Sequence, residues 1–473
     1  MASTIAPVPH PSAAERAAQG KQARKKVPRS QLGEWDLSHR TAEPLALLEQ
    51  QATTRVQDLV PIRYGRMAVS PFTFYRGAAA VMASDLAAAS RSGLEVQLCG
   101  DAHLANLGGF ASPERSLVFD LNDFDETLPG PFEWDVKRLV ASFEVAARHR
   151  ELSDKALKNL TLAVGRSYRV AMRTFSGMSN LDTWYAQLDI PTVVAQWGEE
   201  VTNQTLKNLQ RTVTRAQSKD RLRALAKLTR DVDGEPRLSS DPPLLVPIEE
   251  VFSEVDAERI QTTIRDALRS YRRTLSGDRR HLLESYRLVD LARKVVGVGS
   301  VGMRAWVALL IGRDNDDPLF LQIKEAEASV LEPFLKKSKF SNHGQRVVEG
   351  QRRMQSSSDI FLGWQRVEAL EASDGRMHDY YMRQLWDWKA SANLETMTLE
   401  GFGYYAQICG WTLARAHARS GDRIAIDAYL GSSDGFDRAM AAFATAYADQ
   451  NERDHAALTT AIATGAIEAT SGI

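Results

Sequence analysis

The sequence predicts an α+β fold with a large helical part and a smaller part built on a five-stranded sheet. Two observations lead to this prediction. Apolar residues recur at helical spacing through most of residues 153–290, and again through residues 399–419. Strand-like runs instead gather between residues 294 and 385, where turn residues separate short stretches rich in β-branched and aromatic side chains. We therefore expect helices and strands to be segregated along the chain.

The individual elements follow from the same periodicities and from Gly, Pro and Ser turns between them. We predict helices over residues 44–60, 77–89, 134–149, 154–175, 202–230, 257–275, 279–294, 342–355 and 399–419, and strands over residues 94–98, 116–119, 303–311, 319–325, 361–367 and 379–385. A further strand is expected to start at residue 294 and to lead into the glycine-rich residues that follow, which makes five strands for the sheet.

Composition limits the class of protein. With 473 residues, of which 44% are hydrophobic, the chain can bury a large core in two or more lobes. Its net charge of -1 gives no indication of a nucleic-acid or membrane partner. The two cysteines, Cys99 and Cys409, fit a reducing compartment. No run approaches the ~18 apolar residues that span a bilayer, and no signal peptide is apparent, so we expect a cytoplasmic protein.

Four segments are expected. Residues 1–40 are rich in Ala, Pro, Ser and basic residues, which predicts a disordered basic tail. Residues 41–290 are assigned to the helical lobe, residues 291–393 to the strand-rich lobe, and residues 394–473 to helices that return to the helical lobe.

A first group of polar residues follows the strand at 94–98. Asp101 begins the loop, and Asn106 comes five residues later. After the next short strand come Asp123 and Asp125. An amide and carboxylates on neighbouring loops suit Mg²⁺, and the loop Asp is then free to accept a proton from a hydroxyl. The alternative is that Asp101 and Asn106 cap a turn and the acidic run is a solvated loop.

A second group lies almost 200 residues later. Residues 297–302 contain a GxGxxG pattern followed by strands instead of the helix of a dinucleotide-binding fold, and a third strand ends in Lys324. This order is typical of a kinase nucleotide lobe, with a glycine hairpin over the phosphates and a strand Lys that contacts them. The alternative for Lys324 is an edge-strand lysine. The residues assigned to nucleotide binding are Gly297, Gly299, Ser300, Gly302, Lys324 and, as a helical partner for the lysine, Glu349, with Glu325, Glu327 and Glu332 as competitors.

The two groups together contain both halves of a kinase in reversed order. A conventional kinase has the glycine hairpin and the Lys strand first, and the Asp/Asn loop afterwards. A circular permutation explains the reversal, and permutation is tolerated when the joined ends lie close together at the surface. The sequence therefore predicts a protein-kinase-like two-lobe fold, circularly permuted.

The same residues carry a resemblance to known families. Residues 297–302 with 321–326, residues 100–106 and residues 120–126 resemble the bacterial domain-of-unknown-function 2252 family (DUF2252). Residues 100–135 also look like the catalytic segment of aminoglycoside- and choline-type small-molecule kinases. That likeness implies Asp101 as the catalytic base, Asn106 and Asp123 as metal ligands, Asp125 as a further metal contact and Asp135 as a structural helix-start residue.

The expected function is ATP- and Mg²⁺-dependent transfer of a phosphoryl group to a hydroxyl of an unknown small-molecule or protein acceptor. A nucleotide-binding pseudokinase or a nucleotidyl transferase would use the same residues. A metal-dependent phosphohydrolase would bind metal through His103 and the Asp cluster, but would give the glycine hairpin no role. Arg63, Arg66 and Arg76 lie near the loop in sequence and could bind phosphate or pair with the acidic run.

Overall fold

We describe the protein from a computed structural model. The described residues are 10–189, 192, 193, 211, 214, 221–252, 257–295, 297–368, 377–385 and 388–473. Most of the helix predicted over residues 202–230, and Val296 of the glycine-rich loop, lie outside the described residues.

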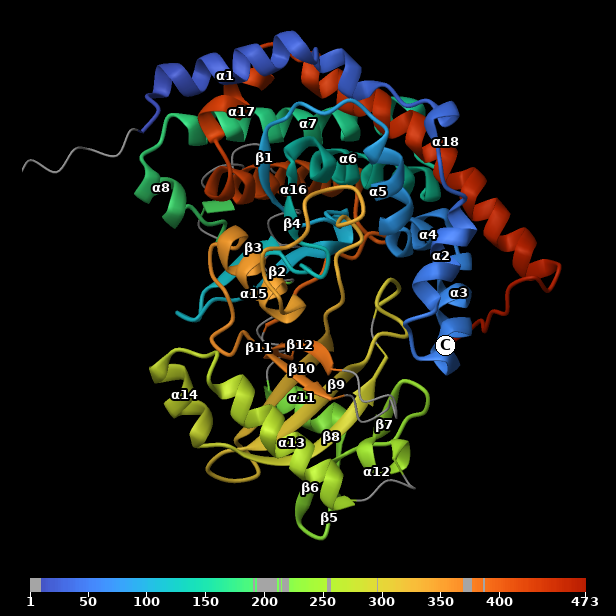
Figure 1. Ribbon diagram of the computed structural model, residues 1–473, viewed down its shortest axis with the longest axis vertical. Helices are drawn as coiled ribbons and strands as arrows, with labels where there is room; N and C mark the ends of the chain where they lie inside the picture. Colours follow the sequence, from blue (N-terminus) through green and yellow to red (C-terminus); the bar gives the residue numbers. More distant parts are fainter. Residues whose placement is uncertain are drawn as a thin grey trace, which may run out of the picture.

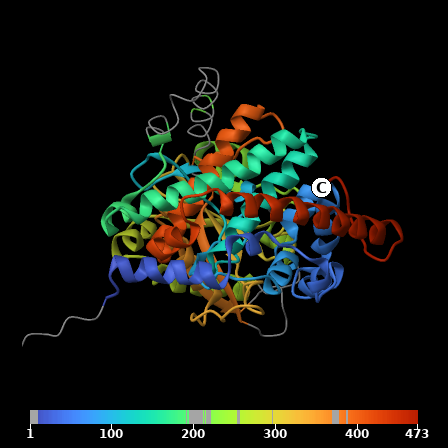
Figure 2. The same cartoon turned by 90° about the horizontal axis from the view of Figure 1, so that it is seen from above.

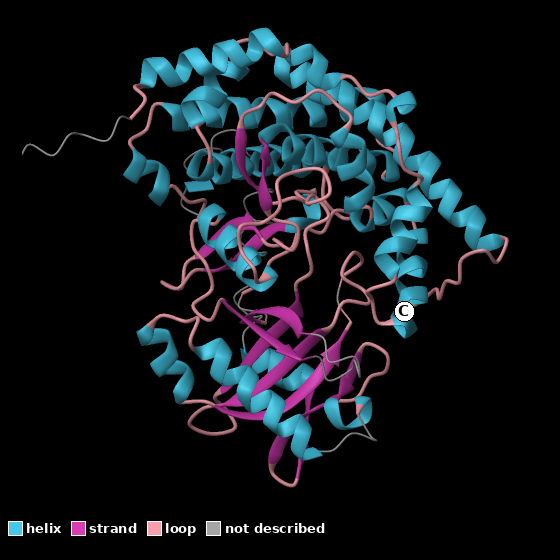
Figure 3. Ribbon diagram, in the orientation of Figure 1, coloured by secondary structure: helices cyan, strands magenta, loops and turns pink. Residues whose placement is uncertain are grey.

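Most helices gather in one part of the molecule, and most strands form a sheet in another (Figure 3). In the helical part, α6, α7, α16 and α18 pack against one another around the largest hydrophobic core. The C-terminal end of α18 extends beyond its neighbours (Figures 1 and 2). The helices of this part are α1 (Ala13–Lys26), α2 (Pro44–Ala52), α3 (Val60–Ala68), α4 (Pro71–Gly77), α5 (Ala79–Ala87), α6 (Phe132–His149), α7 (Asp154–Ser176), α8 (Asn180–Tyr185), α16 (Leu399–Ser420), α17 (Arg423–Leu430) and α18 (Gly435–Ala463).

The strand-rich part is a six-stranded antiparallel sheet in the order β11-β12-β10-β9-β8-β7. The central strand β10 is buried along its whole length, which its apolar sequence favours. The prediction of five strands was one short, because the brief β7 also pairs with β8. The strands are β7 (Leu245–Pro247), β8 (Arg287–Lys294), β9 (Ala305–Ile311), β10 (Pro318–Glu325), β11 (Gly363–Glu368) and β12 (Met377–Gln384).

The segment before the glycine-rich loop differs from its prediction. The helix expected over residues 279–294 ends early, as α14 (Gly277–Glu284), and the remainder forms β8. Pairing with β9 buries Leu291 and Ala292, so tertiary contacts override the helical periodicity. The expected boundary at residue 290 is therefore wrong. The sheet side also includes α11 (Arg221–Leu228), α12 (Ile248–Val251), α13 (Ala257–Arg272) and the hairpin of β5 (Thr229–Val232) and β6 (Glu235–Leu238).

Residues 10–40 do not form the disordered tail that their composition predicts. The described part forms α1, which begins with a capping box between Ser12 and Glu15. This helix packs along α17, where a Cβ on Gly20 would lie 2.0 Å from the Ala425 carbonyl oxygen. Arg16 pairs with Asp422 at 2.8 Å. Close backbone approach and charge pairing thus hold a segment whose composition is polar.

Two short antiparallel strand pairs and helix α15 complete the fold. The strand β1 (Glu95–Leu98) pairs with β4 (Leu128–Pro131), and β2 (Leu107–Ala111) pairs with β3 (Leu117–Leu121). Helix α15 (His343–Met354) contacts β11, β12 and α16. Helix α16 packs against β1, where the Gln97 N–H donates to the Ser420 hydroxyl at 3.3 Å. None of the described helices combines the length and apolar character of a membrane span.

Candidate active site

The loop that carries Asp101 begins with a glycine that no other residue could replace without strain. Gly100 has a φ of +87°, and a Cβ at this position would lie 2.3 Å from the Glu126 carbonyl oxygen. The chain therefore leaves β1 in a sharp turn directly beneath the acidic loop. This turn brings residues 100–106 and 122–126 together, and the Asn122 N–H donates to the Asn106 carbonyl at 2.8 Å.

Asp135, in the first turn of α6, anchors the start of the same loop. Its carboxylate accepts hydrogen bonds from the N–H groups of Cys99 at 2.7 Å and Gly100 at 3.0 Å. His417 on α16 places Nε2 3.2 Å from the same carboxylate, and Tyr168 contacts its Nδ1 at 2.9 Å. The structural role expected for Asp135 fits this geometry. His417 lies behind the loop as a support for Asp135.

Asp101 is held by Arg138, one helical turn after Asp135. The Arg138 Nε donates to Asp101 Oδ1 at 2.8 Å, and the Asn106 amide donates to the Asp101 carbonyl at 2.9 Å. Burial raises the pKa of Asp101, although the Arg138 charge opposes the rise. Sequence reasoning missed Arg138, although its i+3 spacing from Asp135 places both on one face of α6. The arrangement leaves Asp101 Oδ2 as the oxygen free of Arg138.

Lys324 reaches the acidic loop from the sheet. Its ammonium forms a short ion pair with Asp125 and lies 3.8 Å from Asp123. Burial alone would raise the pKa of Asp123, but the charges of Lys324 and Arg383 outweigh it and lower the pKa. Burial and the neighbouring Asp123 instead raise the pKa of Asp125. The structure thus brings together the two groups that are almost 200 residues apart in the sequence.

Two residues of β12 complete this cluster and were missed in the sequence. Tyr381 lies opposite Lys324 in the register of β10 and β12, and its hydroxyl donates to Asp125 at 2.8 Å. Arg383 donates to the Asn122 carbonyl at 2.7 Å. Their two-residue spacing places them on one face of a strand, which is the signal that could have found them once the strand was predicted.

The assignment of Glu349 was wrong. On α15, Glu349 lies 3.4 Å from Arg352, with 36% of its side chain exposed. Lys324 is instead paired with Asp123 and Asp125. Position in a predicted helix was the only basis for Glu349. Of the competitors, Glu325 pairs with Arg304 and His378, and Glu327 bonds Thr54.

The glycine-rich loop joins β8 to β9. Gly297 and Gly302 adopt φ values of +66° and +87°, which explains glycine at both positions. Gly297 and Ser300 border the space above Asp123, and Gly299 borders part of it. Gly302 instead turns toward residues 53–56, which follow α2, because its carbonyl accepts the Val56 N–H at 2.8 Å. Three of the four assigned loop residues therefore face the acidic loop.

A cavity of about 650 Å³ lies between the sheet and the helical part. It falls in the size range typical of small-molecule sites. A smaller hollow of about 100 Å³ adjoins it and is lined by Asp101, His103 and Asp125. The residues that line both spaces include Arg76, Asn106, Asp123, Gly297 and Ser300. Lys324 lines the large cavity, so Lys324 and three residues of the glycine-rich loop border the same continuous region as Asn106 and Asp123.

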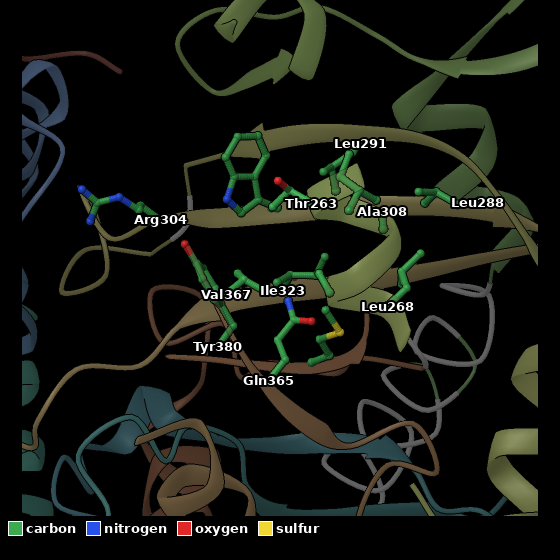
Figure 4. A pocket seen from close by; sticks show the side chains of 14 residues that line it. Thr263, Leu268, Leu288, Leu291, Arg304, Ala308, Ile323, Gln365, Val367 and Tyr380 are labelled. Carbon is green, nitrogen blue, oxygen red and sulfur yellow. The ribbon is translucent and has the colours of Figure 1, made fainter. Parts of the chain in front are cut away.

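The opposite face of the sheet holds a separate, apolar pocket. Figure 4 shows Leu268 of α13 together with Leu288, Leu291 and Ile323 of the sheet around it. Ile323 and Lys324 are neighbours on β10 and therefore point to opposite faces. The apolar pocket is thus separate from the charged cavity and has no cluster of charged side chains that could carry out chemistry.

The side chains around the cavity fit Mg²⁺ if waters and substrate phosphates supply the remaining ligands. The pKa of Asp123 is lowered, so its carboxylate stays negatively charged. The Asn106 side chain donates a hydrogen bond through Nδ2, which leaves its amide oxygen available as a metal ligand. Among the described residues, no three His, Cys, Asp or Glu side chains form a cation-binding group. Mg²⁺ is commonly held by one or two carboxylates together with waters and substrate phosphates, so two protein ligands are enough.

Fold and cavity together define an α+β protein with a charged cavity beside a six-stranded sheet. The chain belongs to a bacterial family described as "Uncharacterized protein conserved in bacteria (DUF2252)", whose model matches residues 55–461. The family predicted from the sequence motifs is therefore confirmed. No curated protein and no solved structure matches the chain.

Proposed function

We propose that this protein is an ATP- and Mg²⁺-dependent phosphotransferase with a circularly permuted kinase-like arrangement. The observation that supports the proposal best is the meeting of Lys324 with Asp123 and Asp125 beside the glycine-rich loop. Neither group is sufficient alone. The loop and Lys324 offer a cradle for phosphates, and Asp101, Asn106 and Asp123 offer a proton acceptor and metal ligands.

Each residue has a defined task in this proposal. Lys324 and the backbone of the glycine-rich loop hold the phosphates of ATP. Asn106 and Asp123 hold Mg²⁺, which neutralises charge on the phosphates when bound. Asp101 Oδ2 takes the proton of the acceptor hydroxyl, whose oxygen bonds to the γ-phosphorus while the bond to the ADP oxygen breaks. Burial raises the pKa of Asp101, which makes its carboxylate a better proton acceptor.

Labelled nucleotide separates this proposal from its alternatives. The full chain is incubated with Mg²⁺, a small-molecule extract of bacterial cells, and ATP labelled at either the γ- or the α-phosphate. We expect γ-label in a new small-molecule product and no α-label. Transfer of α-label would instead identify a nucleotidyl transferase. Release of phosphate from phosphate esters without ATP would identify a phosphohydrolase.

Two variants control this experiment. Asp101→Asn keeps the shape of the loop but removes the proton acceptor, so transfer should fall by about 100-fold or more. Asp449→Asn changes an aspartate whose side chain is 52% exposed on α18, outside the cavity, and should transfer at the wild-type rate. Equal transfer by wild type and Asp101→Asn would remove Asp101 from the reaction. No label transfer and no nucleotide binding by the wild type would overturn the proposal as a whole.

A further inference from the structure

The helical part contributes two arginines to the wall of the cavity that form no ion pair with a described carboxylate. Burial lowers the pKa of one of them, Arg76, and the charge of Asp101 opposes this fall. Arg76 lies in the last turn of α4, and Arg150 follows directly after α6. Both line the large cavity. Within the described part of the chain, neither forms an ion pair, whereas the nearby Arg138 and Arg148 both do.

Arg76 is the arginine nearer to the proposed chemistry. It borders the large cavity and also the small hollow that contains Asp101. Its Nε is buried and has no hydrogen-bond acceptor, and its guanidinium stands 6.0 Å from the ring centre of Phe72. Buried guanidinium groups normally have acceptors, because burial of an unpaired charge is costly. Arg76 therefore has hydrogen-bonding capacity that the protein itself does not use.

Arg150 also has a buried guanidinium nitrogen without a hydrogen-bond acceptor. One terminal nitrogen, Nη2, donates to the Met397 carbonyl at 2.5 Å, and the other, Nη1, is buried without an acceptor. The Phe402 ring lies 5.2 Å from the guanidinium and fixes its plane. A carbonyl and a ring hold the side chain in place but do not neutralise it.

The charge of the whole cavity agrees with these two side chains. Six Lys or Arg side chains line it, against three Asp or Glu side chains. Of the three acids, Asp123 is assigned to metal, and Asp359 already accepts the N–H groups of Phe361 and Gln384. The cavity is thus prepared for more negative charge than its own residues supply.

We propose that Arg76 and Arg150 bind an oxyanion of the acceptor, so that the acceptor is a small molecule with a phosphate or carboxylate group as well as a hydroxyl. Guanidinium groups recognise both anions through paired N–H donors. Both arginines line the same cavity of about 650 Å³, a volume that favours a small acceptor over a folded protein. This inference rests on the proposed function for the hydroxyl and the transfer, but the anion site can be tested separately.

Anion binding is measured by thermal melting of the full chain with Mg²⁺ and adenylyl imidodiphosphate, a non-hydrolysable ATP analogue that fills the γ-phosphate position. Inorganic phosphate and sodium acetate are then added, with sodium chloride at equal ionic strength as the reference. We expect phosphate or acetate to raise the melting temperature more than chloride does. The more effective of the two identifies the anion class.

Three variants give the decision. Arg76→Gln and Arg150→Gln should each lower the affinity for the added anion by about tenfold or more, because each removes charge-assisted hydrogen bonds. Arg148→Gln is the matched control, since Arg148 lies two residues from Arg150 but pairs with Glu144 and Asp449. It should bind the anion as the wild type does.

The outcomes separate the two proposals. An anion effect that is absent from the wild type, or that persists in either Arg76→Gln or Arg150→Gln, overturns the anion site. Absence of any shift with the ATP analogue overturns the proposed function instead. A phosphate or acetate shift that depends on both arginines would then still establish the anion site.

Discussion

Replacing Lys324 with methionine tests whether the ion-pair cluster exists as described. The Lys324 side chain is only 3% exposed, and it stands between Asp123 and Asp125. Methionine keeps most of the apolar stem but removes the ammonium. The change leaves two neighbouring carboxylates without a cation, so the repulsion between them is no longer balanced.

The size of the expected loss in stability depends on how deeply Asp123 and Asp125, the partners of Lys324, are buried. Removing one partner of a buried ion pair costs about 3–5 kcal/mol. Asp123 is 30% exposed and Asp125 is 13% exposed, so water solvates part of the remaining charge. We therefore expect the free energy of unfolding to fall by about 3 kcal/mol at neutral pH. Urea denaturation followed by tryptophan fluorescence measures this loss.

The pH dependence of the free energy of unfolding provides a second test of the ion pair. Lys324 lowers the pKa of Asp123 in the folded wild type, so its contribution is present above the ordinary carboxyl pKa and is lost as pH falls. The gap between wild type and Lys324→Met should therefore be smaller at about pH 4 than at about pH 8. Adding Asp125→Asn to Lys324→Met should recover at least about 1 kcal/mol. Wild-type stability in the single variant at about pH 8, or no recovery in the double variant, would refute the reasoning.

Three further predictions concern the loops around this cluster. Gly100→Ala should lower the free energy of unfolding by more than about 2 kcal/mol, because the positive φ and the Glu126 carbonyl leave no room for a Cβ. Gly277→Ala, where a Cβ would meet nothing within 4 Å, should cost little in the same denaturation assay. Burial raises the pKa of Glu126 from 4.5 to about 7, so stability should decline as pH rises between these values, and Glu126→Gln should flatten that decline in melting curves. Asp123→Asn should abolish label transfer from γ-labelled ATP while weakening nucleotide binding only partly, and wild-type transfer by this variant would contradict the metal role.

The sequence predicted long or strongly apolar elements more accurately than the strand that leads into the glycine-rich loop. The strands predicted over residues 303–311, 319–325 and 379–385 correspond to β9, β10 and β12, and the helix over 399–419 corresponds to α16. These segments are long or strongly apolar, so their periodicity is distinct. The strand β8 was mistaken for helix because its burial comes from pairing with β9, which a local pattern does not contain.

Some residues of the candidate site could likewise be predicted from the sequence, and others could not. Asp101, Asp123 and Lys324 could be chosen because their residue types and spacing suit one known chemistry, and the structure brings them together. The partner of Lys324 could not be predicted, because a helical glutamate was sought on α15 while the lysine pairs with the acidic loop. Tyr381 was missed because its position opposite Lys324 depends on the register between β10 and β12. Arg138 was missed because its contact with Asp101 depends on which face of α6 points toward the loop. Both become visible only once the elements are placed in space.

The central claim is that one nucleotide is bound jointly by residues from both halves of the chain. Isothermal titration of Mg·ATP into the wild type, Asp123→Asn and the double variant Lys324→Met/Asp125→Asn tests this claim most directly. We expect Mg²⁺-dependent binding by the wild type and an affinity lower by about tenfold in each folded variant. Absence of binding to the wild type, or equal affinity in all three proteins, would contradict it.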